Sequence, residues 1–186
     1  MISGFRVGFE GAAGHYQIQP DILTFGKIVG GGMPVGAYAA SREIMSHIAP
    51  EGNVYQAGTL SANPVSMAAG LATLQVCLED KFYENLEEKT QNFVSKLQEF
   101  LENSNIPAHV QSIGSIFWIA FSRDRVLKAS DIKSESMIHY KKLHHHLLTN
   151  GVYFGPSGYE VGFISVAHMK DDLDKAIDII QESFDS

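Results

Sequence analysis

The uneven distribution of glycine and charge along the chain constrains its fold more than any other feature of the sequence. Residues 1–72 hold 12 of the 17 glycines, but only three of the 14 Lys and Arg residues and four of the 21 Asp and Glu residues. Glycine lacks a Cβ atom, so it lets backbone segments approach each other or a ligand closely. We therefore expect residues 1–72 to pack around a ligand or a subunit interface, and residues 73–186 to form a solvated small domain.

Charge and hydropathy exclude several classes of protein. The formal net charge is -7 at pH 7, and there is no cluster of Lys and Arg that would bind a nucleic-acid backbone. No apolar run reaches the roughly 20 residues of a membrane-spanning helix, and no basic start precedes an apolar stretch as in a secretory signal. We therefore expect a cytoplasmic protein with neither a nucleic acid nor a membrane as its partner.

Periodicity in the second segment predicts helices that alternate with strands. Apolar residues recur at helical spacing from Tyr83 to Leu101, with charged residues opposite them, which predicts an amphipathic helix. The β-prone apolar run over residues 115–121 predicts a buried strand. Ser134 is placed to cap a further helix, which would end at Asn150 and Gly151.

In the remainder of this segment we expect further strands that complete a small antiparallel sheet. Residues 152–154 and residues 163–167 are expected to form strands, and residues 173–184 a final helix with Asp171 and Asp172 in its first turn. The expected order is α-β-α-β-β-α. Helices grouped against a small sheet make an α+β layer.

Two groups of residues that could carry chemistry are better explained as structure. Cys77, the single cysteine, lies in an apolar helical context, where a free thiol is usually a buried small hydrophobic residue. Residues 144–146 are three consecutive histidines, but neighbours on a helix point about 100° apart and do not converge on one metal ion. We therefore expect neither a catalytic thiol nor a metal site.

The most informative segment is residues 21–37, in which Lys27 stands between an apolar strand and the three glycines of residues 30–32. The spacing matches neither a Walker phosphate loop nor a dinucleotide-binding fingerprint. An amine held in a poorly solvated pocket loses its proton more easily and becomes a nucleophile toward carbonyl groups. The alternative is that Lys27 is a solvated surface residue, and the chemistry of the segment alone favours this alternative.

The order Thr24, Phe25, Gly26 and Lys27, followed by the glycine-rich turn, resembles the lysine motif of the class III pyridoxal-phosphate-dependent aminotransferases. Further motifs are similar, in the same order along the chain, to landmarks of the glutamate-1-semialdehyde 2,1-aminomutase family within that class; they lie in residues 4–16, 55–64, 151–153, 160–163 and 167–168. The resemblance implies an α/β fold type I transferase. Residues 1–72 would be part of its cofactor-binding large domain, and residues 73–186 an α+β small carboxy-terminal domain with its connecting helix.

The resemblance also implies roles for four residues. Lys27 would be the catalytic lysine, which binds pyridoxal 5'-phosphate as a Schiff base and carries the proton of the isomerisation. Gly58 and Thr59 would reach the cofactor phosphate of the neighbouring subunit of a homodimer, and Glu160 would lie near the substrate. The small-molecule substrate would be glutamate-1-semialdehyde, which the pyridoxamine 5'-phosphate form of the family converts to 5-aminolevulinate for tetrapyrrole synthesis.

One family residue is missing from the motif at residues 4–6. In the family this motif is preceded by an Asp-Glu-Val sequence, whose aspartate pairs with the pyridine nitrogen of the cofactor. Here Met1 stands about where that valine would be, so the aspartate is absent. Because the protonated ring is the electron sink of the reaction, we expect this chain to be inactive or weak on its own. We also expect exposed apolar surface around residues 15–45.

Three interpretations of function stay open at this point. The first is the aminomutase, represented by its carboxy-terminal portion. The second is another class III aminotransferase, because the lysine motif alone does not determine the substrate. The third is a non-catalytic fragment that dimerises or pairs with a separate chain.

Arg6 could bind an anion, but it is more simply explained as an arginine that packs its stem at a domain junction.

Overall fold

The computed structural model describes residues 1–185. The chain divides into two compact units, of which the first is Met1–Tyr83 and the second begins at Glu84. The change of composition at residue 72 falls inside helix α3 (Pro64–Cys77), which belongs to the first unit. The structural division therefore lies later in the chain than the change of composition.

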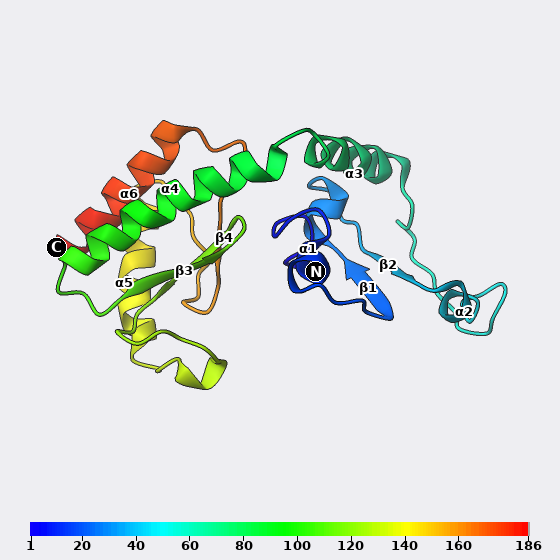
Figure 1. Cartoon of the computed structure of the whole chain (residues 1–186), viewed down its shortest axis with the longest axis horizontal. Coiled ribbons are helices and arrows are strands. Elements are labelled where there is room, and N and C mark those ends of the chain that lie inside the picture. Colours follow the sequence, from blue (N-terminus) through cyan, green and yellow to red (C-terminus); the bar gives the residue numbers. More distant parts are fainter. Residues whose placement is uncertain (186) are drawn as a thin grey trace. The chain divides into compact units, whose positions relative to one another are not determined.

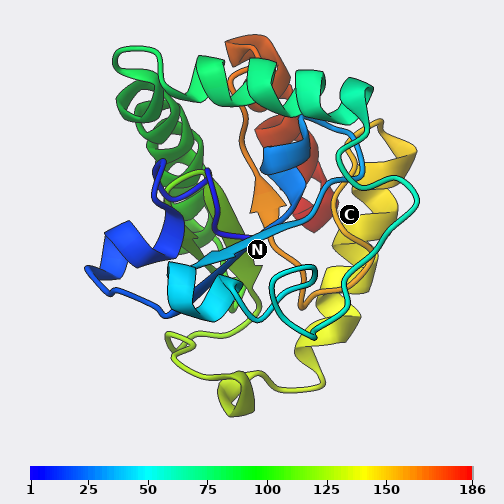
Figure 2. The same cartoon turned by 90° about the vertical axis from the view of Figure 1, so that its right-hand side faces the viewer.

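The first unit consists of short elements and long connections. Its elements are α1 (Gly11–Tyr16), β1 (Ile22–Phe25), the 3-10 helix η1 (Lys27–Gly30), β2 (Ala37–Ala40), α2 (Arg42–Met45) and α3 (Pro64–Cys77). Strands β1 and β2 pair antiparallel, with Ile22 opposite Ala40 and Phe25 opposite Ala37 (Figure 1). Residues 46–63 join α2 to α3 without a helix or strand, as the long loop in Figure 2 shows.

Helix α3 begins at a strong start signal. The side chain of Asn63 accepts hydrogen bonds from the backbone N–H groups of Val65 at 3.0 Å and Ser66 at 3.3 Å. Pro64 occupies the first turn, where its missing N–H costs nothing. The helix carries no charged residue, and its small residues face η1 while several larger apolar side chains are exposed. The exposed large apolar residues of α3 are Val65, Met67, Leu71 and Val76.

Apolar side chains are exposed where the sequence predicts them. Between residues 15 and 45 the exposed large apolar residues are Tyr16, Ile18, Ile22, Met33 and Tyr38. The expectation of exposed apolar surface in this segment is confirmed. Such surface in a protein commonly marks a region that another molecule covers.

The second unit is a three-stranded antiparallel sheet with three helices. Its elements are the greater part of α4 (Phe82–Asn103), then β3 (His109–Ile113), β4 (Ile116–Ala120), η2 (Ala129–Asp131), α5 (Ser136–Thr149), β5 (Gly162–Phe163) and α6 (Lys170–Asp185). The strand order is β3-β4-β5, with β4 in the centre. Helices α4, α5 and α6 and strand β4 confirm the predicted elements, and the sheet is antiparallel as expected.

Of two strands predicted in this unit, one is absent and the other is shorter than predicted, because backbone groups of both segments form hydrogen bonds outside the sheet. The backbone N–H of Val152 donates to the carbonyl of Leu147 at 2.8 Å and closes the end of α5, so residues 152–154 form no strand. The strand predicted over residues 163–167 is β5, which ends at Phe163. The carbonyl oxygens that follow accept hydrogen bonds from the ammonium group of Lys89: Val166 at 2.9 Å and His168 at 2.8 Å.

Two further expectations also differ from the structure. Strand β3 was not predicted, so the observed order is α-β-β-α-β-α rather than α-β-α-β-β-α. Only two of its five residues, Val110 and Ile113, are apolar, and none is fully buried, which makes it less conspicuous than β4. Helix α5 begins at Ser136 without a capping side chain, so Ser134 is not its cap; the carbonyl of Ser134 instead accepts a hydrogen bond from the N–H of Met137.

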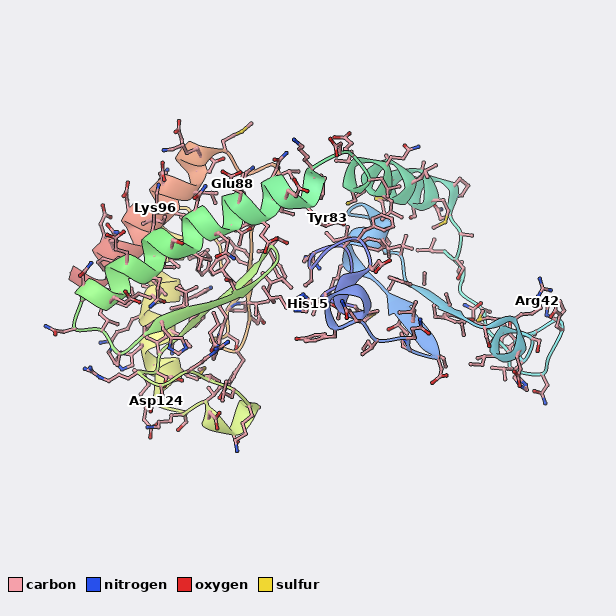
Figure 3. All side chains as sticks on the ribbon, viewed as in Figure 1. His15, Arg42, Tyr83, Glu88, Lys96 and Asp124 are labelled. Carbon is pink, nitrogen blue, oxygen red and sulfur yellow. The ribbon has the colours of Figure 1, made fainter. Side chains whose placement is uncertain are left out.

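The core of the second unit lies between its helices and the central strand. The side chains that are almost wholly buried include Leu97, Leu101, Leu143, Leu147 and Ile180. Figure 3 labels Tyr83, Glu88 and Lys96 along α4. Lys96 lies 2.5 Å from the carboxylate of Asp174 on α6, which links these two helices at the surface. Within residues 1–185, no helix is both long and apolar enough to span a membrane.

Candidate functional site

Lys27 lines an open pocket of about 610 Å³ in the first unit. The lysine follows strand β1 by one residue, Gly26, and is the first residue of η1. Its side chain is exposed, so the residues that the structure describes do not provide the burial expected of a reactive amine. The other residues that line the pocket are Arg6, Ile28, Gly31, Gly32, Met33, Pro34, Val35 and Thr73.

The backbone of Lys27 is held in an unusual conformation. Its φ angle is 61°, in the left-handed region, which costs a residue with a side chain roughly 1–2 kcal/mol. Gly26 before it is fully extended, so the chain changes direction sharply between the strand and η1. Strained residues persist only where their surroundings hold them, and they cluster at functional sites. The conformation therefore agrees with a role for Lys27 that goes beyond packing.

The glycine-rich loop allows a close approach, but much of that approach is made by the protein itself. Gly31 has a φ of +56°, and a Cβ atom there would lie 2.3 Å from the carbonyl oxygen of Ala69 and 2.6 Å from the hydroxyl of Thr73. Gly32, with a φ of +87°, has nothing within 4 Å of its missing Cβ and faces open space. Gly31 therefore allows helix α3 to pack against the loop, whereas Gly32 leaves the pocket open.

Arg6 lies in the wall of the same pocket as Lys27. Its guanidinium donates a hydrogen bond to the carbonyl of Ile2 at 2.9 Å, and burial lowers the pKa of Arg6 from its ordinary value. Sequence reasoning favoured a packing role for Arg6 and did not single out Thr73. The uncharged face of α3 that carries Gly70 and Thr73 was the available signal for a helix packed against the lysine segment.

Gly58 and Thr59 lie in the loop between α2 and α3 and are not among the residues that line the Lys27 pocket. The N–H of Ser61 donates to the carbonyl of Gly58 at 2.9 Å, which forms a turn. The structure therefore does not place either residue in the Lys27 pocket. Their role at a cofactor phosphate stays a prediction.

Glu160 belongs to the second unit, in the loop that precedes β5. Its N–H donates to the carbonyl of Ser157 at 2.9 Å. Its carboxylate lies against the backbone of Gly155, where an added Cβ would be 1.8 Å from Oε2. The hydroxyl of Tyr140 on α5 donates to the Gly155 carbonyl at 2.6 Å. Glu160 therefore lies in a loop that the hydrogen bond of Tyr140 links to α5. The role of Glu160 toward a substrate stays a prediction.

The phenol of Tyr140 makes this loop sensitive to alkaline pH. Burial, followed by the charges of Glu160 and Tyr153, raises the pKa of Tyr140 to about 12. The folded chain thus holds the phenolic proton more tightly than the unfolded chain does. The corresponding stability is present below pH 10 and is lost as the pH rises from 10 toward 12, at up to about 1.4 kcal/mol per pH unit.

We expect urea unfolding, followed by the fluorescence of Trp118, to show this loss in the wild-type chain. Trp118 donates a hydrogen bond from Nε1 to the carbonyl of Gly158 at 2.8 Å, so it reports on the same loop. In Tyr140→Phe the fall in unfolding free energy between pH 10 and 11.5 should be shallower than in the wild type. Equal slopes in the two proteins would contradict the raised pKa.

The residues that sequence reasoning explained as structure occupy structural positions. Cys77 is buried, and burial raises the pKa of Cys77, which disfavours the reactive thiolate. His144, the first of the three consecutive histidines, stacks on Tyr140 with ring centroids 6.3 Å apart. Within residues 1–185, no three His, Cys, Asp or Glu side chains are placed to hold a metal ion together.

The chain belongs to the class III aminotransferases. The profile of that family, described as Aminotransferase class-III, matches residues 3–184. Among curated proteins, the chain is 48% identical over 179 residues to the glutamate-1-semialdehyde 2,1-aminomutase of Legionella pneumophila (strain Lens). That alignment covers 96% of this chain and 42% of the relative, so the chain spans less than half the length of the curated relatives it matches.

Solved structures agree with this assignment. An omega-transaminase from Sphaerobacter thermophilus matches with a TM-score of 0.85 and 27% identity, covering 99% of this chain and 42% of that one. A transaminase with pyridoxal phosphate bound matches with a TM-score of 0.82 and 27% identity, covering 97% of this chain and 42% of that one. The fold of both units is thus one that class III transaminases share.

Proposed function

We propose that this chain carries the lysine-bearing part of a glutamate-1-semialdehyde 2,1-aminomutase. The observation that supports it best is the 48% identity to named aminomutases, which extends over 96% of the chain. Residues 1–72, the greater part of the first unit, would then belong to the cofactor-binding large domain, and residues 73–186 would form the small domain with its connecting helix. The proposal extends to a homodimer in the cytoplasm that acts on a small molecule.

The pocket at Lys27 suits pyridoxal phosphate by its donor chemistry. An exposed primary amine opens onto about 610 Å³ of space, which is what an aldehyde needs in order to bond to that amine. When bound, this cofactor supplies an aldehyde and an electron-withdrawing ring. Lys27 would hold it covalently, and Gly58 and Thr59 of a neighbouring subunit would bind its phosphate through backbone N–H and hydroxyl groups.

Lys27 would also move a proton. A lysine amine that is released from its covalent bond can accept a proton from one carbon and return it to another, provided that the amine stays in place. Here the left-handed backbone of Lys27 and the packing of η1 on α3 fix the point from which the side chain extends. Glu160 would lie near the substrate and influence that transfer by its charge.

The direct test is covalent capture of pyridoxal phosphate by the 186-residue chain. We expect borohydride reduction, followed by peptide mass spectrometry, to fix the cofactor on Lys27, and Lys27→Ala to abolish that adduct. Lys81→Ala is the matched control, because Lys81 belongs to the same unit, is exposed and also has a left-handed backbone, with a φ of 59°. Labelling spread evenly over the lysines, with Lys27 not preferred, would overturn the proposal.

A second candidate is another class III aminotransferase, because an omega-transaminase matches the structure with a TM-score of 0.85. Amino transfer from an external amino acid to a keto acid, without formation of 5-aminolevulinate, would favour it. The aminomutase predicts the reverse, namely 5-aminolevulinate from glutamate-1-semialdehyde with no external donor. A chain that captures no cofactor at Lys27 would instead fit the non-catalytic fragment, whose exposed apolar residues would serve association.

A further inference from the structure

The Lys27 pocket is cationic in an acidic chain. Residues 1–72 contain only three basic residues, and two of these, Arg6 and Lys27, line this one pocket. None of the four acidic residues of the same segment lines it. A chain with a net charge of -7 therefore places two positive groups, and no negative one, around a space of about 610 Å³.

Arg6 is positioned to act on a ligand rather than to point freely into water. Its guanidinium is half-buried and is anchored by the hydrogen bond to the carbonyl of Ile2 at 2.9 Å. A guanidinium has five N–H donors in a rigid fork that suits carboxylate and phosphate oxygens. Burial lowers the pKa of Arg6 because part of its hydration is lost.

The remainder of the wall would strengthen such an interaction. It consists mainly of apolar side chains and glycine backbone, with the hydroxyl of Thr73 as a further polar group. Charges interact more strongly beside apolar walls than in open water. A ligand with a carbonyl group that reacts with Lys27 and an anionic group that binds Arg6 therefore fits the chemistry of this lining.

We propose that Arg6 is a binding residue that makes the Lys27 pocket select carbonyl compounds bearing a carboxylate or a phosphate. This inference rests on the proposed reaction of Lys27 with carbonyl groups. In that reaction the amine nitrogen adds to the carbonyl carbon, the carbonyl oxygen leaves as water with the two hydrogens of the amine, and a carbon–nitrogen double bond forms. Arg6 takes no part in the bond changes and binds the anionic end.

The test compares aldehydes that differ in charge. Propionaldehyde is neutral, succinic semialdehyde carries a carboxylate, and glycolaldehyde phosphate carries a phosphate. Each is trapped on the 186-residue chain with cyanoborohydride, and the rate of labelling at Lys27 is measured by peptide mass spectrometry. We expect at least one anionic aldehyde to label Lys27 about tenfold faster than propionaldehyde, as one charge-assisted contact allows. The two anionic aldehydes show whether a carboxylate or a phosphate is preferred.

Substitutions then assign the preference to Arg6. Arg6→Gln should bring the labelling rates of anionic and neutral aldehydes close together, whereas Arg6→Lys should keep part of the preference. Arg42→Gln is the matched control, because Arg42 is the third basic residue of the segment and lines a different pocket; it should leave the preference unchanged. In the wild type, the preference should fall as salt is added.

The possible failures are distinguishable. If no aldehyde labels Lys27, the proposed function fails. If Lys27 is labelled but the wild type treats neutral and anionic aldehydes alike, the inference on Arg6 is overturned while the proposed function stands. A preference that survives intact in Arg6→Gln also overturns it. Because the wild-type comparison and its salt dependence need no variant, poor folding of Arg6→Gln would not remove the test.

Discussion

Replacing Gly70 by alanine is expected to destabilise the first unit by about 3 kcal/mol, the upper end of what overpacking costs. In an exposed helix the same substitution would stabilise by roughly 1 kcal/mol, because alanine is the better helix former. Here a Cβ atom on Gly70 would lie 2.4 Å from the carbonyl oxygen of Val29 and 3.8 Å from the Cα of Gly30. Both are backbone atoms of η1, so the clash is relieved only if α3 and η1 move apart.

Hydrogen exchange measured by mass spectrometry should show this separation locally. Peptides that cover η1 and α3 should lose protection in Gly70→Ala, and covalent capture at Lys27 should slow, because Lys27 is the first residue of η1. Ala68→Val is the control on the same helix: Ala68 is exposed, so only the small difference in helix propensity, about 0.6 kcal/mol, should appear. Unchanged or increased protection in Gly70→Ala would show that this contact does not hold α3 in place.

The glycine pattern illustrates what the sequence could predict at this site. The close approach implied by three consecutive glycines exists, but its partner at Gly31 is helix α3 rather than a ligand. Sequence reasoning found Lys27 because its local motif is contiguous. It did not find Thr73 or assign Arg6 to the same pocket, because tertiary packing alone brings these residues to Lys27.

In the second unit, strong local patterns were sufficient for some elements and not for others. Helix α4 is recognisable by the helical spacing of its apolar residues, and strand β4 by its continuous apolar run. Residues 152–154 have equally apolar side chains, yet their first N–H closes α5 instead of pairing in the sheet. The turn after β5 is held by Lys89, which lies far away in sequence on α4. Backbone groups that bind distant partners are not visible in a local pattern.

Replacing Phe117 by alanine is expected to cost the second unit about 3–5 kcal/mol of unfolding free energy, as truncation of a buried aromatic residue does. Phe117 is only 3% exposed, and its ring lies 5.1 Å from that of Phe93 on α4 and 5.6 Å from that of Phe154. It therefore joins the central strand to a helix and to the loop after α5. Urea unfolding followed by circular dichroism measures the loss. Ile138→Ala, an exposed position on α5, should change stability by less than about 1 kcal/mol.

The ring of Phe117 also explains why residue 162 is a glycine. A Cβ atom on Gly162 would lie 2.2 Å from Cζ of that ring, so Gly162→Ala should destabilise the wild type by forcing the ring or strand β5 to move. In the Phe117→Ala background the added methyl group enters the vacated space and should cost little or stabilise. The two substitutions should therefore couple by about 1–3 kcal/mol in a double-mutant cycle. Additive effects would show that the ring does not determine the position of β5, and hence does not help to place the loop of Glu160 that precedes it.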